Sequence, residues 1–93
     1  MHVYRVELTP AADRQLSKLR GAAREMLAAA IVALASNPRP AGCKKLRGAG
    51  DLWRIRVRDY RIVYRIAKER LLVTVVKLGR RKDVYRGLAS DVE

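Results

Sequence analysis

The sequence predicts an α+β fold, in which a twisted antiparallel sheet has two helices packed on one face. Two patterns lead to this class. Apolar residues recur at helical spacing in the first part of the chain, and from Lys44 onward they alternate with polar residues at the two-residue period of strands. A length of 93 residues suits one domain, 1–93. We expect an N-terminal strand, two helices, three consecutive strands and a short C-terminal helix around residues 84–88.

The first strand and both helices are predicted from residues 3–42. Residues 3–8 alternate loosely between apolar and polar side chains, as a strand does. Thr9 and Pro10 then match the N-cap and the first position of a helix. The buried stripe of this helix consists of Ala12, Leu16 and Leu19. Gly21 interrupts the pattern, and a second, alanine-rich helix continues to the turn-forming segment SNPRPAG at residues 36–42.

Three strands follow, at residues 53–57, 60–66 and 71–78. Arg58 and Asp59 leave room only for a tight hairpin between the first two. The apolar face of these two strands, expected beneath the helices, consists of Trp53, Ile55, Val57, Tyr60, Ile62, Tyr64 and Ile66. The opposite face, expected to remain uncovered, carries Arg54, Arg56, Arg58, Arg61 and Arg65. The third strand is apolar on both faces, which suits the centre of a sheet.

Positive charge is concentrated in the second half of the chain. The formal net charge is +12, and residues 44–86 contain 15 Lys and Arg residues against four acidic ones. Guanidinium groups bind phosphate through paired hydrogen bonds, so the arginine face predicts contact with a nucleic acid backbone. Lys44, Lys45 and Arg47 extend the basic strip into the segment before the 53–57 strand. The alternative is a basic face that contacts water and ions alone.

Residue types exclude most catalytic sites. The chain has one cysteine and one histidine, which rules out an intrachain disulfide, a cysteine-based zinc site and a Ser-His-Asp triad. We expect no metal and no cofactor. The sequence has neither a signal-peptide pattern nor an apolar run long enough to span a membrane, so we expect a cytoplasmic protein with no membrane partner. Tyr85 either lies over the basic face or anchors the C-terminal element in the core.

The chain also resembles a known family. The segments KKLRG (44–48), LWRIRVRDYRIVYRI (52–66) and GRRKDVYR (79–86), preceded by LTPAADRQLSKL (8–19), are similar to the RelE/ParE superfamily of bacterial toxins. Among its branches the chain is most similar to RelE, over residues 3–86. The expected order of elements is the order in that fold.

This resemblance implies an endoribonuclease that cuts mRNA in the ribosomal decoding site and is silenced by a cognate RelB-like antitoxin, acidic and partly disordered. Cleavage would proceed by attack of the 2′-hydroxyl on the adjacent phosphate. Arg61 and Arg81 would stabilise the phosphorane, and Tyr85 would orient the base and ribose. Arg54 matches a position where other members carry lysine, and it would hold a phosphate. The expected RNA-binding residues are Lys44, Lys45, Arg47, Arg56, Arg58, Arg65 and Lys82.

The sequence does not determine which group accepts the proton or which molecule the protein acts on. Arginine cannot act as a base at ordinary pH, which leaves Tyr85, Lys82, Asp59 or ribosomal RNA for that role. A ParE-like gyrase poison on the same fold is a second hypothesis, and a non-catalytic RNA-binding module is a third.

Overall fold

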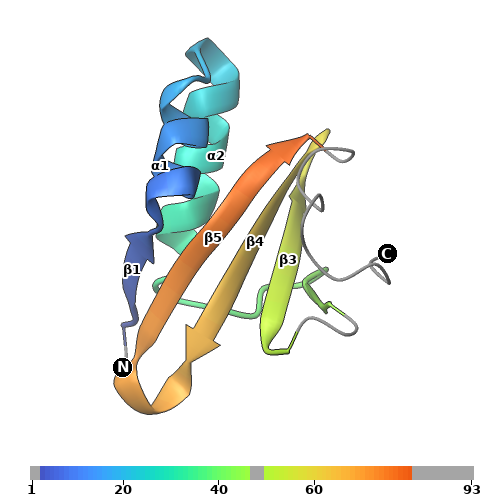
Figure 1. Ribbon diagram of the computed structural model, residues 1–93. Coiled ribbons are helices and arrows are strands. Elements are labelled where there is room, and N and C mark those ends of the chain that lie inside the picture. The colour runs from blue at the N-terminus through green and yellow to red at the C-terminus, as the bar shows by residue number, and fades with distance from the viewer. Residues whose placement is uncertain (1–2, 47–49, 81–93) are drawn as a thin grey trace.

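A computed structural model describes residues 3–46 and 50–80 of the chain (Figure 1). The elements in chain order are β1 (Arg5–Leu8), α1 (Pro10–Ser17), α2 (Gly21–Ala33), β2 (Lys44–Lys45), β3 (Leu52–Val57), β4 (Tyr60–Ala67), a 3₁₀ turn η1 (Lys68–Arg70) and β5 (Leu72–Arg80). The strands form one sheet in the order β1-β5-β4-β3-β2. Figure 1 shows both helices on the same face of this sheet, which confirms the predicted α+β class.

The sheet is mixed, and this differs from the antiparallel sheet that we expected. β1 pairs in parallel with β5, from Arg5 opposite Leu72 to Leu8 opposite Val75. A hairpin cannot join parallel strands, and here two helices and three strands separate β1 from β5 along the chain. β2 is a further difference, because Lys44 and Lys45, which we expected in a loop, pair with the edge of β3.

The hydrophobic core lies between the helices and the sheet. α1 and α2 contribute Ala12, Leu27 and Ile31, all buried, and Leu16 and Leu19 pack against them. From the strands, the fully or nearly fully buried members are Ile55, Ile62, Tyr64, Val73, Val75 and Leu78. The predicted apolar face of β3 and β4 is therefore confirmed as the helix-covered face. None of the helices in the described ranges is long and apolar enough to cross a membrane.

The β3–β4 hairpin is as tight as predicted. Val57 pairs with Tyr60, so Arg58 and Asp59 alone form the turn. Arg58 has a φ of 57°, in the left-handed region that glycine and asparagine adopt more readily than arginine. Arg58 consequently belongs to the turn and does not continue the row of arginines on β3. The expected helix at residues 84–88 lies outside the described residues.

Thr9 connects the start of α1 to the sheet. Its hydroxyl accepts a hydrogen bond from the Ala12 amide at 3.2 Å and donates one to the Val76 carbonyl at 2.8 Å. Thr9→Val keeps the shape of the side chain and removes both bonds. We expect this variant to lower the free energy of unfolding by roughly 1–2 kcal/mol, measured by urea denaturation. An unchanged unfolding midpoint would show that the cap does not stabilise the fold.

Candidate nucleic-acid interface

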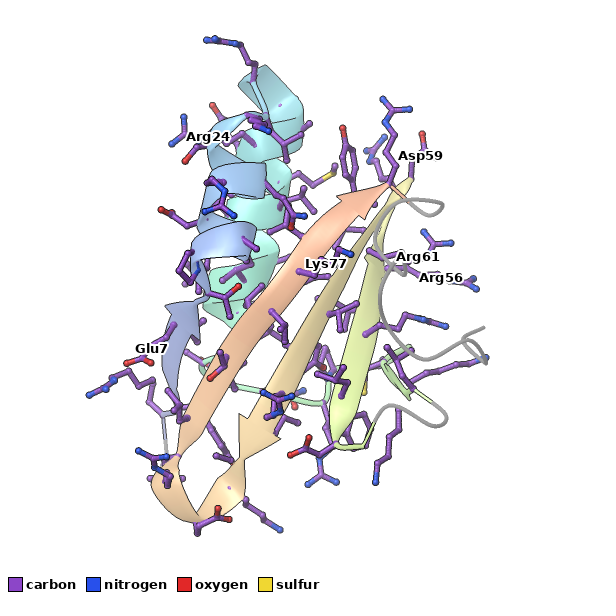
Figure 2. The ribbon with its side chains drawn as sticks, in the orientation of Figure 1. Glu7, Arg24, Arg56, Asp59, Arg61 and Lys77 are labelled. Carbon is purple, nitrogen blue, oxygen red and sulfur yellow. The ribbon has the colours of Figure 1, made fainter. Side chains whose placement is uncertain are left out.

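The arginines of β3 and β4 share the face of the sheet that the helices do not cover. Strand register places Arg56 directly opposite Arg61, and Arg54 opposite Val63. Arg65, opposite Leu52, continues the same face. Figure 2 shows the side chains of Arg56 and Arg61 extending to the same side, away from α1 and α2. The prediction that guanidinium groups gather on one face is confirmed for these strands.

These arginines differ in their exposure to solvent. Arg56 and Arg65 are exposed, whereas Arg54 is 1% and Arg61 is 7% exposed. The expectation of a uniformly uncovered arginine face is therefore wrong for Arg54 and Arg61. Arg54 lies on an inner strand between β2 and β4, and Arg61 folds against its own hairpin turn. A buried cation loses hydration, so groups that accept its hydrogen bonds are needed to keep it in place.

Arg61 is held by the backbone of the hairpin. Its Nη1 donates to the carbonyl oxygens of Arg58 at 3.4 Å and Tyr60 at 3.3 Å. A guanidinium group is planar, so two contacts to one terminal nitrogen restrict the orientation of the whole group. The unfavourable φ of Arg58 is part of this arrangement, because the turn aims the Arg58 carbonyl back toward β4. Arg61 thus has a fixed position before any ligand arrives.

Arg54 connects β3 to the loop at residues 38–43. Its Nη1 donates to the Gly42 carbonyl at 3.3 Å. The same loop is held by the Tyr64 hydroxyl, which donates to the Pro38 carbonyl at 2.6 Å, and by Arg39, whose guanidinium lies 5.3 Å from the centre of the Trp53 ring. Burial raises the pKa of Tyr64 well above its usual value, so this hydroxyl stays protonated. Arg54 therefore makes a structural contact, and the phosphate contact that we expected of it stays a prediction.

Comparisons with known proteins agree with this geometry. Residues 6–85 match the family model of the ParE toxin of type II toxin-antitoxin systems, parDE. The chain is also 33% identical over 86 residues to the mRNA interferase toxin RelE of Escherichia coli (strain K12), a match that covers 88% of this chain and 90% of the relative. The chain belongs to the RelE/ParE toxin family.

Solved structures of RelE/ParE toxins have the same fold. The archaeal RelE–RelB complex from Pyrococcus horikoshii superposes with a TM-score of 0.75 and 28% identity, covering 88% of this chain and 99% of that one. The intact E. coli RelBE toxin-antitoxin complex gives a TM-score of 0.71 at 32% identity, covering 83% of this chain and 95% of that one. Both structures contain the toxin together with its antitoxin.

The other predicted site residues of this RelE/ParE toxin lie in different places. Lys44 is exposed opposite Arg54 on the arginine face, whereas Lys45 is opposite Trp53 and so lies on the other face of the sheet. Arg65 forms an exposed ion pair with Asp51 at 3.1 Å, an interaction that adds little stability. The remaining predicted residues, which all lie outside the described ranges, are Arg47, Arg81, Lys82 and Tyr85.

Lys77 is a cation on the arginine face of the sheet that sequence reasoning missed. It pairs with Val63, while Gly79, two residues further along β5, pairs with Arg61. Lys77 is therefore on the same face as Arg61, on the neighbouring strand β5 and two residues before the residue that pairs with Arg61 (Figure 2). We had interpreted residues 71–78 as apolar on both faces, and a lysine within such a strand was the available signal. Among the described residues, no group of three or more His, Cys, Asp and Glu side chains could hold a metal ion.

Arg54 and Arg56 allow stability and RNA binding to be tested separately in the toxin. Arg54→Met removes a buried guanidinium that holds the 38–43 loop, so we expect a loss of roughly 1–3 kcal/mol in unfolding free energy. Arg56→Met changes an exposed side chain, and substitutions at exposed positions usually change the unfolding free energy by no more than about 0.5 kcal/mol. Arg56→Met should instead weaken binding to single-stranded RNA. It should also reduce the slope of log affinity against log salt concentration by about one. Equal unfolding midpoints for the two variants would contradict the structural role of Arg54.

Proposed function

We propose that this toxin is an endoribonuclease that cuts mRNA on the ribosome, through attack of the 2′-hydroxyl on the adjacent phosphate. The observation that carries the proposal is the pair of arginines in opposite positions, Arg56 and Arg61, with Arg61 held by the backbone carbonyls of Arg58 and Tyr60. The relatedness to a toxin named an mRNA interferase supports it.

The reaction places extra negative charge on the phosphate oxygens as the phosphorane forms. Guanidinium donors fixed in advance stabilise that charge better than mobile ones, because little reorganisation is needed during the reaction. Arg61 has this fixed orientation at the reacting phosphate, and exposed Arg56 opposite it provides a second cation for the adjoining RNA backbone. The resemblance adds Arg81 at the leaving oxygen and Tyr85 at the base and ribose.

The attacking 2′-hydroxyl must lose a proton. Asp59, one of the acceptors considered above, lies at the tip of the hairpin, and in Figure 2 its side chain extends away from Arg56 and Arg61. Lys77 lies beside Arg61 on the same face, and an amine can exist in the neutral form that a base requires, whereas guanidinium practically cannot. We therefore assign proton removal to Lys77 within this proposed mechanism.

The inhibiting partner in this proposal is an acidic, partly disordered antitoxin. The two structural relatives described above are toxins solved in complex with RelB antitoxins. The concentrated positive charge of this toxin favours a partner of opposite charge, because attraction between unlike charges speeds association and lowers the free energy of the complex.

A ParE-like gyrase poison is the second candidate function. The family model that matches residues 6–85 is that of ParE toxins, which favours this alternative. A poison of this kind acts by binding a protein and has no need of a fixed guanidinium at a phosphate. The two candidates therefore differ in what the loss of Arg61 does.

Arg61→Ala tests the proposed function directly. We expect purified toxin to cut messages on translating ribosomes and Arg61→Ala to cut them roughly 100-fold to 1,000-fold more slowly, measured by primer extension. Arg24→Ala is the control, since Arg24 is an exposed arginine of α2, far from Arg56 and Arg61 (Figure 2), and its loss should not slow cleavage. Intact messages with the wild-type toxin would contradict the proposal, and DNA breaks in cells that express it would favour gyrase poisoning.

Lys77→Arg tests the assigned proton acceptor. Arginine keeps the positive charge and nearly the length of lysine but loses the ability to take up a proton. We expect cleavage to slow by roughly 100-fold or more, with unchanged affinity for single-stranded RNA, measured by single-turnover kinetics and by fluorescence anisotropy. Wild-type cleavage rates for Lys77→Arg would place the acceptor elsewhere.

A further inference from the structure

A cavity of about 530 Å³ opens beside β3, next to residues 55–57, which follow the two residues that pair with β2. Its apolar lining comes from Ala30 and Ala33 of α2 and from Ile55 and Val57 of β3. Residues 40–42 of the loop that Arg54 holds through the Gly42 carbonyl also line it. The small side chains at the end of α2 leave this space unfilled.

Among the described residues, the charged ones that line this cavity are all cations. Lys44, Arg54 and Arg56 lie beside its apolar lining, and no acidic residue of the described ranges contributes to it. Lys44 and Arg56 are exposed, whereas Arg54 is buried and holds the loop. A ligand that fits this lining has an apolar, roughly planar body and a negatively charged group at its edge, and the volume is in the range of small-ligand sites.

Arg56 belongs to both the cavity and the arginine face. It faces Arg61 across the β3–β4 pair, so the two side chains stand a few ångströms apart. A chain of nucleotides with one phosphate at Arg61 therefore has a neighbouring phosphate within reach of Arg56. From there the next base can turn around the edge of β3 and enter the cavity.

We propose that this cavity binds one nucleotide of the RNA next to the cleaved bond, with its base against Ala30, Ala33, Ile55 and Val57 and its phosphate at Lys44 and Arg56. The inference rests on the proposed function, because that function places RNA on the arginine face. An acidic peptide is the other ligand with suitable charge. The continuity of the cavity with the arginine face through Arg56, and its compact shape, favour a nucleotide.

The test measures how affinity for RNA depends on oligonucleotide length. The probes are 2′-O-methyl RNAs, which cannot be cut, of three to five nucleotides, extended separately at the 5′ and the 3′ end. For wild-type toxin we expect one of the two extensions to raise affinity about tenfold. Ala33→Leu, which fills the cavity from α2, should lose this gain and keep the affinity for the shortest RNA. Ala29→Leu, at an exposed position of the same helix that does not line the cavity, should keep the gain.

Ala41→Leu provides a second way to fill the cavity, from the loop, if Ala33→Leu does not fold. The same length dependence in wild type and in the filled variants would overturn the inference. A filled variant that binds RNA normally but loses affinity for an acidic antitoxin peptide would also overturn it and would assign the cavity to a protein partner.

The same measurements separate this inference from the proposed function. A wild-type toxin that leaves ribosome-bound messages intact, but gains affinity with the added nucleotide, would refute ribonuclease activity and support the cavity as a nucleotide site. A toxin that cuts messages and shows no such gain would support the proposed function and overturn the inference.

Discussion

The register of the β3–β4 hairpin is the constraint on which the site depends. Side chains alternate along a strand, so a slip of one residue would send the arginines into the core and the isoleucines to the opposite face. The two-residue turn at Arg58 and Asp59 fixes this register, and the Arg58 carbonyl also holds Arg61, together with the Tyr60 carbonyl at the start of β4. Fold and site therefore depend on the same short turn, in which Arg58 has a conformation that glycine adopts more easily.

The basic face combines two kinds of arginine. Arg54 and Arg61 are buried and contact backbone carbonyls, whereas Arg56 is exposed and directly opposite Arg61. Cations gathered on one surface attract anionic ligands to it. Negative ligands, whether RNA or an acidic protein, therefore stabilise the protein as they bind. The same physical chemistry explains both the proposed substrate and the proposed inhibitor.

The sequence predicted the helices, the hairpin and the faces of β3 and β4, because these depend on local spacing. It did not predict the parallel pairing of β1 with β5, which is a contact between residues far apart in the chain. The burial of Arg54 and Arg61 was also missed, because it depends on a loop and a turn that alternation does not describe. Lys77 was overlooked for a related reason, since only the pairing with β4 shows that it is beside Arg61.

The parallel pairing of β1 with β5 bears on how the protein is made. β1 is synthesised first, but its partner strand extends from Leu72 to Arg80, so the sheet cannot be completed until most of the chain has left the ribosome. Contacts between residues so distant in sequence slow folding, because the intervening chain must be ordered before they form. A nascent chain therefore lacks the finished sheet until β5 has been synthesised.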